Sequence, residues 1–194
     1  DKYHNERLRY LTKPLLVPLI IAFYCVSADV INWLVVIGLF CGFLGDVFLL
    51  GKKDVFLLLG LCSFLAGHVF YSIAFLGSTN YLANVPLWFY LLTIPYIMYG
   101  IFVMSALWKH LGNKKIPAVL YITALLTMSF CSLGRIWNGF DLAFILPWAG
   151  SLLFIASDSS LGRSILADKN QDHEVFIMIT YVMAQVMIML GFLM

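Results

Sequence analysis

Three ionisable side chains lie deep within apolar stretches of the sequence: Asp46, His68 and Asp158. Apart from Tyr and Cys, they are the titratable groups placed well inside such stretches. An ionised side chain at the centre of a membrane helix costs about 2.5–3.5 kcal/mol on insertion scales, so such groups usually face the interior of a helix bundle. Carboxyl and imidazole groups exchange protons with substrates. These residue types therefore indicate acid–base chemistry.

The two aspartates are predicted to lie at one depth. Asp46 is six residues before Lys52, and Asp158 is five residues before Arg163. At about 1.5 Å of rise per residue, each carboxyl group lies roughly 7–9 Å inside the same end of the bundle. Plainer interpretations stay open, because Asp46 could pair with Lys52 or Lys53, and Asp158 could form a local ion pair with Arg163.

Other polar residues in apolar stretches also allow two interpretations. His68 lies about 20 Å into its helix and could be a packing histidine as readily as a catalytic one. Tyr181 and Gln185, one turn apart, could line a polar cavity or only tie helices together, and we favour the second. Lys13 fits a basic residue at a membrane surface, and it is also suitably placed for a lipid phosphate.

Small residues beside Asp46 indicate close helix contact. Gly38, Gly42 and Gly45 precede Asp46 at spacings of four and three residues. Small residues at this spacing let helix backbones approach each other closely. A comparable stripe on the next apolar stretch consists of Gly60, Phe64, Gly67 and Tyr71.

The composition indicates the elements that position these residues. The chain has 194 residues, of which 62% are hydrophobic and 11% are charged, whereas an ordinary soluble domain is about a quarter charged. Apolar runs long enough to cross a hydrocarbon layer of about 30 Å follow one another with short polar breaks. We expect an all-α, polytopic membrane bundle forming a single domain over residues 1–194. The seven expected membrane-spanning helices are Pro14–Ala28, Ile31–Leu50, Val55–Leu76, Val85–Trp108, Ile116–Leu133, Leu142–Leu161 and Val175–Met194.

The basic residues predict the orientation, because cytoplasmic loops are enriched in Lys and Arg. With seven spans, all 12 Lys and Arg residues fall on one side except Arg135. The N-terminus is therefore expected in the cytoplasm and the C-terminus on the opposite side, with a bacterial inner membrane favoured over the endoplasmic reticulum. This topology accounts for the net charge of +2, so no nucleic-acid partner is expected. The four cysteines form no C-x-x-C pair and have no His at ligand spacing, so neither metal nor cofactor is expected.

Five segments carry a family resemblance. They are "TKPLLVPLI" (12–20), "FLGDVFLL" (43–50), "GLCSFLAGHVFYSIAF" (60–75), "GSLLFIASDSSL" (150–161) and "ITYVMAQVMI" (179–188). In this order and spacing they resemble the YhhN family of integral membrane proteins, which includes the lysoplasmalogenases, over nearly the whole chain. Many members carry a further hydrophobic helix before the K-P motif, whereas 13 largely polar residues precede Pro14 here. The bundle is therefore expected to have seven helices, or eight if a natural N-terminal helix is missing from the chain.

The resemblance implies hydrolysis of the vinyl ether bond of lysoplasmalogens. The products are a fatty aldehyde and glycerophosphoethanolamine or glycerophosphocholine. By motif, the proposed catalytic pair of the family falls on Asp46 and Asp158, and the His and Tyr of the third-span motif fall on His68 and Tyr71. The lysophospholipid and the bilayer are the expected partners, and nothing in the sequence indicates an oligomeric state.

The chemistry of a vinyl ether suits two carboxyl groups. Protonation of the distal alkene carbon gives an oxocarbenium ion, which water captures to form a hemiacetal. The reaction needs one carboxylic acid and one carboxylate, as in glycosidases, and two neighbouring carboxyl groups share one proton readily. We favour Asp46 as the acid, because Asp158 has neighbouring hydroxyl groups on Ser157, Ser159 and Ser160 that could support its ionised form. The lipid phosphate is expected near Lys13, Lys52 or Arg163.

Two other functions remain open. Intramembrane Asp and His side chains also relay protons in transporters, so a small transporter or proton-coupled lipid carrier is the main alternative. A protein with the same fold could also act on another ether or ester lipid, or only sense lipid. Release of aldehyde from a lysoplasmalogen separates the first proposal from these.

Overall fold

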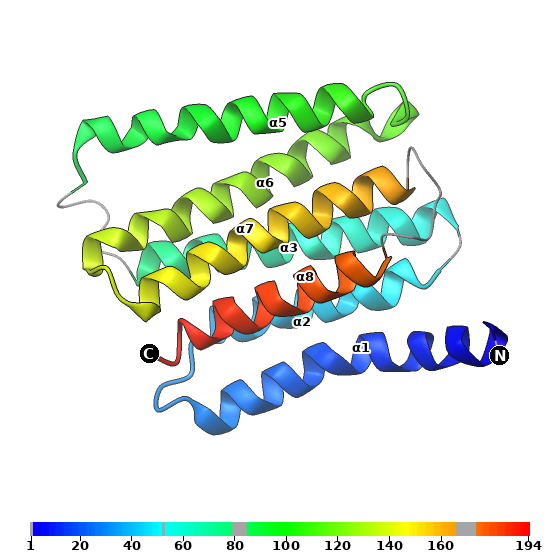
Figure 1. Cartoon of the computed structure of the whole chain (residues 1–194), viewed down its shortest axis with the longest axis horizontal. Helices are drawn as coiled ribbons and strands as arrows, with labels where there is room; N and C mark the ends of the chain where they lie inside the picture. Colours follow the sequence, from blue (N-terminus) through cyan, green and yellow to red (C-terminus); the bar gives the residue numbers. More distant parts are fainter. Residues whose placement is uncertain (1, 52, 79–84, 166–173) are drawn as a thin grey trace.

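Seven α-helices and three short 3₁₀ segments make up the described part of the protein. The computed structural model describes residues 2–51, 53–78, 85–165 and 174–194, with side chains from residue 15 onward within these ranges. Figure 1 shows the long helices lying side by side along one direction. In order they are α1 (Lys2–Ser27), α2 (Trp33–Leu49), α3 (Asp54–Gly77), η1 (Leu87–Leu92), α5 (Thr93–Leu107), η2 (Gly112–Lys114), α6 (Lys115–Leu133), η3 (Gly134–Asn138), α7 (Leu142–Arg163) and α8 (Glu174–Leu190).

The expected all-α fold is confirmed for the described residues, and each predicted span corresponds to a helix. The fourth span is divided into η1 and α5. Pro95 lies in the first turn of α5 and has no N–H to donate to the carbonyl of Leu91, so one α-helical hydrogen bond is missing where η1 meets α5. The first helix is longer than predicted, because α1 begins at Lys2 rather than at Pro14.

Length and composition identify a membrane protein. Four helical stretches are long and apolar enough to cross a bilayer: Asp54–Gly77, Leu87–Leu107, Gly112–Asn138 and Leu142–Arg163. Three shorter apolar helices, Leu15–Ser27, Trp33–Leu49 and Glu174–Leu190, accompany them. A helix of 17 residues is about 26 Å long, at the lower limit for crossing the hydrocarbon layer.

Side chains cap two of the helices and join neighbouring ones. The Asn32 side chain accepts a hydrogen bond from the Leu34 N–H at 3.1 Å, and the Asn32 N–H donates to the Tyr24 hydroxyl at 3.1 Å. Asn32 therefore caps α2 and fixes its start to α1. Asp141 caps α7 in the same way, accepting from the Phe144 N–H at 3.0 Å. Such caps satisfy N–H groups that a helix start leaves without an intrahelical partner.

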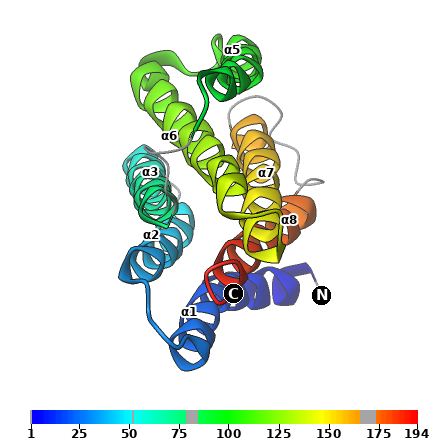
Figure 2. The ribbon, with the colours of Figure 1, turned by 90° about the vertical axis from the view of Figure 1, so that its left-hand side faces the viewer.

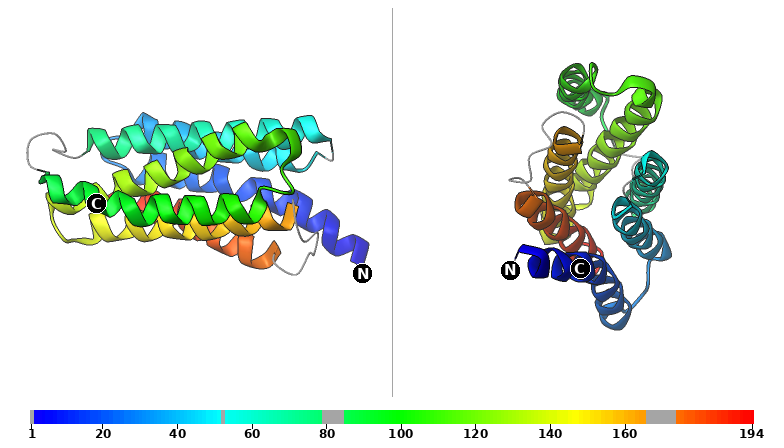
Figure 3. Two further views of the ribbon diagram at one scale, coloured as in Figure 1. Left: turned by 90° about the horizontal axis from the view of Figure 1, so that it is seen from above. Right: turned by 90° about the vertical axis from the view of Figure 1, so that its right-hand side faces the viewer.

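The helices form a layered arrangement around the site. The most extensive contacts join α2 with α3 and α7 with α8, and α6 packs between α3 and α7. The end-on view shows α5 at the edge of the bundle, beside α6 and far from α1 (Figure 2). The right-hand view in Figure 3 shows α5 at that edge again. The outward side chains of α5 are apolar and exposed, with Ile97, Ile101 and Phe102 each exposing more than half of their surface.

The predicted glycine face of α2 is a helix contact. A Cβ added to Gly38 would lie 2.7 Å from the ring of Tyr71, and one added to Gly45 would lie 2.7 Å from the ring of Phe64. Both rings belong to α3. A methyl group cannot occupy this space, so glycine at these positions allows α2 and α3 to lie close together.

Candidate active site

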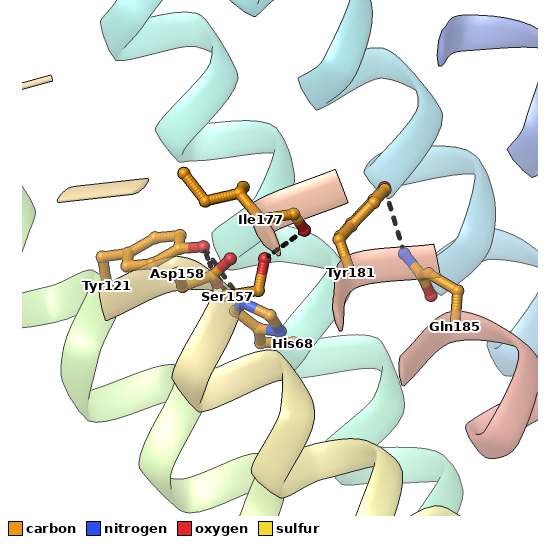
Figure 4. A network of polar contacts seen from close by, with 7 residues as sticks. All are labelled: His68, Tyr121, Ser157, Asp158, Ile177, Tyr181 and Gln185. Atoms are coloured by element: carbon orange, nitrogen blue, oxygen red, sulfur yellow. Dashed lines mark hydrogen bonds and ion pairs between the residues drawn. The ribbon is translucent and has the colours of Figure 1, made fainter. Parts of the chain in front are cut away.

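The carboxyl group of Asp158 lies where α3, α6 and α7 meet. Its Oδ2 accepts a hydrogen bond from the phenol of Tyr121 and lies 3.4 Å from His68 Nε2. His68 Nε2 is also 3.3 Å from the Tyr121 hydroxyl oxygen. Figure 4 shows the three side chains directed toward one another. The contacts of Asp158 therefore come from two other helices, and not from a local ion pair with Arg163, which is exposed in the last turn of α7.

His68 is enclosed by aromatic rings. Its side chain is 1% exposed, and the ring centroids of Tyr121 and Phe154 lie 5.4 and 4.9 Å away in edge-to-face geometry. His68 Nδ1 has no hydrogen-bond partner among the described residues. A buried N–H without an acceptor is unfavourable, so the neutral tautomer with its hydrogen on Nε2 fits this site best. That hydrogen then points toward Asp158 and Tyr121.

Asp46 and Asp158 line the same small pocket. Asp46 is 3% exposed and comes from α2, one turn before the end of the helix. The pocket holds about 270 Å³ of space not filled by protein atoms, including its opening. It has room for water but not for a lipid chain. Its other lining residues are Leu49, Phe64, Ser157, Leu161, Ile177, Met178 and Tyr181.

A chain of hydrogen bonds holds Tyr181 in this pocket. The Tyr71 hydroxyl donates to Gln185 Oε1 at 2.5 Å, and Gln185 Nε2 donates to the Tyr181 hydroxyl at 3.2 Å. Gln185 is completely buried. Because the Tyr181 oxygen accepts from Gln185, its own proton is left to donate into the pocket that Asp46 lines. Tyr181 therefore lines the small pocket, and Gln185 links α8 to α3 through Tyr71.

Gly42 makes room for this chain. A Cβ on Gly42 would lie 2.6 Å from Gln185 Nε2 and 2.9 Å from the Tyr181 hydroxyl. The polar groups of α8 thus occupy space beside α2 that any larger residue would fill. The glycine face predicted from the sequence therefore allows close packing of α2 on α3 and also makes room for the polar side chains of α8.

The serines beside Asp158 do not support its carboxylate, contrary to expectation. Ser157 Oγ donates to the Ile177 carbonyl at 3.1 Å, and Ser160 Oγ donates to the Ala156 carbonyl at 2.8 Å. Ser159 Oγ lies 2.9 Å from the Tyr99 hydroxyl. Serine in a helix commonly bonds to a backbone carbonyl one turn earlier. The hydrogen bond that Asp158 accepts comes instead from Tyr121.

A larger apolar pocket adjoins the small polar one. It contains about 790 Å³ of unfilled space, including its opening, and shares Leu49, Phe64, Asp158 and Leu161 with the small pocket. Tyr121 lines it as well. The wall is otherwise mostly aliphatic and comes from α3, α5, α6 and α7, with Leu57, Leu61, Leu107, Ala118, Ile122 and Leu125 among its residues. Asp158 is therefore accessible from both pockets.

Not all expected site residues are placed. The side chain of Lys13 and the whole of Lys52 lie outside the described residues. Tyr71 is buried behind Gln185 and does not line either pocket. Within the described ranges, no three His, Cys, Asp or Glu side chains gather closely enough to hold a metal ion.

Sequence reasoning missed Tyr121. A signal was present, because Tyr121 is seven residues after Lys114 and so lies roughly 10 Å inside its helix, close to the depth expected of the aspartates. Tyrosine is common in membrane helices as a packing or interface residue. Its type alone therefore did not distinguish it from the other tyrosines.

The fold and the site together define a helical membrane protein with two buried carboxyl groups in a small pocket that adjoins a larger apolar one. The sequence model of the YhhN family matches residues 8–192, nearly the whole chain, and the protein belongs to this family. The expected resemblance is confirmed. No curated protein sequence matches the chain. No solved structure matches it either.

Proposed function

We propose that this protein hydrolyses the vinyl ether bond of lysoplasmalogens, releasing a fatty aldehyde and glycerophosphoethanolamine or glycerophosphocholine. The observation that carries the proposal is the shared pocket of Asp46 and Asp158, together with the adjoining apolar pocket that Asp158 also lines. Two carboxyl groups beside space for an aliphatic chain suit an acid-labile lipid. Family membership supports the same conclusion.

The reaction needs one proton and one water. Asp46, as the acid, protonates the distal carbon of the alkene, and the positive charge that forms is shared between C1 of the chain and the ether oxygen. Asp158, as the carboxylate, stabilises this oxocarbenium ion and removes a proton from the water that attacks C1. As the hemiacetal breaks down, Asp158 gives the proton taken from water to the departing glycerol oxygen, and Asp46 accepts the hydroxyl proton as the aldehyde forms. Both carboxyl groups thereby regain their starting protonation states. The net change is addition of one water and cleavage of one C–O bond.

The contacts of the two aspartates support this division of roles. The Tyr121 hydroxyl donates to Asp158, and the Nε2–H of His68 points toward the same oxygen. Donors directed at a carboxylate stabilise its negative charge. Asp158 also lines the apolar pocket, where the cation would form, and Asp46 would deliver its proton from the adjoining small pocket, which Asp158 shares. General acid–base groups of this kind contribute about 10²–10⁴-fold to the rate.

All seven helices are proposed to cross the membrane, with the N-terminus in the cytoplasm of a bacterial cell. The one basic residue on the opposite side, Arg135, supports this. It is 7% exposed, its guanidinium donates to the Gly191 carbonyl at 3.2 Å and it lies 4.7 Å from the centre of the Phe192 ring. The Arg135 guanidinium thus binds residues at the end of α8 and is not a basic group of the membrane surface. Alkaline phosphatase fused after Met194 should be active, and fused before residue 1 it should be inactive.

The activity test uses purified protein in detergent with a 1-alkenyl lysophospholipid and measures aldehyde. Wild type should release aldehyde, and Asp46→Asn and Asp158→Asn should each lose at least about 100-fold. Asp29→Asn is the matched control, since Asp29 is exposed between α1 and α2. Full activity in both site variants would exclude the paired-carboxyl mechanism. Lipid uptake into proteoliposomes without hydrolysis would favour the carrier alternative.

A further inference from the structure

An ion pair lies at one end of the apolar pocket. Lys114 lines this pocket, and its Nζ donates to Asp54 Oδ1 at 2.6 Å. The Lys114 side chain is 25% exposed and that of Asp54 is 82% exposed. Exposed ion pairs contribute little to stability. Lys114 can therefore exchange Asp54 for another anion at small expense in free energy.

The pocket runs from this pair into the bundle. From Lys114 at the end of η2, its wall passes along α6 through Ala118, Tyr121 and Ile122 to Leu125. Ile122 also lines a second apolar groove, between α5 and α6, which continues toward Phe130. One end of the pocket is thus charged, the middle carries Tyr121 and Asp158, and the far end is apolar. This order matches head group, ether linkage and chain of a lysophospholipid.

The spacing along α6 fits this order. Tyr121 follows Lys114 by seven residues, which corresponds to roughly 10 Å along the helix axis. In a glycerophospholipid ether, five bonds join the phosphorus to the ether oxygen, roughly 6 Å when extended with bonds near 1.5 Å. The flexible side chain of Lys114 can span the difference.

We propose that Lys114 and Asp54 form the head-group site of this enzyme and select a zwitterionic head group. Lys114 binds the lipid phosphate, and Asp54, released from Lys114, binds the cationic amine or quaternary ammonium. The inference rests on the proposed function, because it takes the ether linkage to lie beside Asp158 and Tyr121. It adds Lys114 to the phosphate ligands expected from the sequence, Lys13, Lys52 and Arg163.

The adjacent residue supplies a matched control. The Nζ of Lys115 lies 4.6 Å from the centre of the Trp108 ring, and Lys115 does not line the pocket. Lys114→Gln and Lys115→Gln remove the same charge at neighbouring positions. Only the first change is expected to affect the lipid.

Hydrolysis kinetics in mixed micelles test Lys114. The substrates are a 1-alkenyl glycerophosphoethanolamine and a 1-alkenylglycerol, which has the same vinyl ether and no phosphate. Lys114→Gln should raise KM about tenfold for the phospholipid and leave the alkenylglycerol unchanged, and Lys114→Arg should restore most of the loss. Identical behaviour of Lys114→Gln and Lys115→Gln on both substrates would overturn the inference.

A second comparison tests Asp54. Wild type should cleave the phosphoethanolamine lipid about tenfold better, by kcat/KM, than a 1-alkenylglycerol phosphate that lacks the amine. Asp54→Asn should remove this preference. An unchanged ratio in Asp54→Asn would overturn the assignment of Asp54.

Binding of a 1-O-alkyl glycerophosphoethanolamine separates this inference from the proposed function, because this saturated ether carries no vinyl group to hydrolyse. The readout is the thermal shift of the purified protein. Binding that weakens in Lys114→Gln but not in Lys115→Gln, in a protein without vinyl ether hydrolysis, would support the head-group site and overturn the proposed reaction. Vinyl ether hydrolysis together with equal binding by Lys114→Gln and Lys115→Gln would support the proposed reaction and overturn the head-group site.

Discussion

The phenol of Tyr121 donates a hydrogen bond to the carboxylate of Asp158, from a helix that sequence reasoning did not connect to it. The bond joins α6 to α7 at the boundary between the polar and apolar pockets. His68 of α3 lies within 3.4 Å of both hydroxyl and carboxylate oxygens. Three helices thus fix the orientation of one carboxyl group, and this relationship can be tested by removing single atoms.

Replacement of Tyr121 by Phe should lower aldehyde release by about 10- to 100-fold. A hydrogen bond to a charged group contributes about 1.5–3 kcal/mol, and each 1.4 kcal/mol corresponds to tenfold in rate. The ring that packs on His68 is retained. Tyr99→Phe is the control, since the Tyr99 hydroxyl contacts Ser159 Oγ rather than an aspartate. Equal activity of both phenylalanine variants would show that Tyr121 does not act through Asp158.

Substitutions of His68 should separate a packing role from an electrostatic one. His68→Gln can keep an N–H near the position of Nε2, whereas His68→Leu fills the space between Tyr121 and Phe154 without a donor. We expect the Gln variant to retain much of the activity and the Leu variant to lose about tenfold, because the carboxylate loses one donor. Thermal unfolding identifies variants that fail by misfolding. If the Leu variant is folded and fully active, His68 only packs.

Residue spacing within single helices predicted part of the site, whereas which helices contact each other could not be predicted from the sequence. The number of residues from each aspartate to the next basic residue predicted one shared level for Asp46 and Asp158, which line the same pocket. The glycine spacing predicted a close helix contact, and α2 makes this contact with α3. The positions of Tyr121 and Lys114 at the pockets were found only from the structure. The rotation of α6 about its axis depends on packing against several neighbours, and spacing along one helix does not predict it. The prediction that serine hydroxyl groups support the Asp158 carboxylate was wrong for a local reason, because Ser157 and Ser160 donate to backbone carbonyls instead.

Replacement of Gly42 by Ala should reduce both stability and activity. The added methyl group would meet Gln185 Nε2 at 2.6 Å and the Tyr181 hydroxyl at 2.9 Å. Overpacking of this kind destabilises a protein by about 1–3 kcal/mol, and movement of Tyr181 would alter the pocket that contains Asp46. Gly77→Ala is the control, because nothing lies within 4 Å of a Cβ at that position. Thermal unfolding and aldehyde release should both distinguish the two alanine variants.

Two variants of the Tyr71–Gln185–Tyr181 chain should separate stability from catalysis. Gln185→Leu removes the amide that donates to Tyr181 and accepts from Tyr71. It leaves the Tyr71 hydroxyl buried without its acceptor, which costs about 1–3 kcal/mol, and it releases the Tyr181 hydroxyl from its fixed position. Both the unfolding temperature and aldehyde release should therefore fall.

Tyr71→Phe breaks only the first bond of this chain. Gln185 Nε2 still donates to the Tyr181 hydroxyl, so Tyr181 stays in place while the Gln185 carbonyl oxygen loses its partner. We expect the unfolding temperature to fall and aldehyde release at permissive temperature to stay within about twofold of wild type, since surviving bonds keep their geometry in a packed interior. Tyr71→Phe with the activity loss of Gln185→Leu would instead place Tyr71 itself in the catalytic network. Full activity in Gln185→Leu would show that the position of Tyr181 does not matter for the reaction.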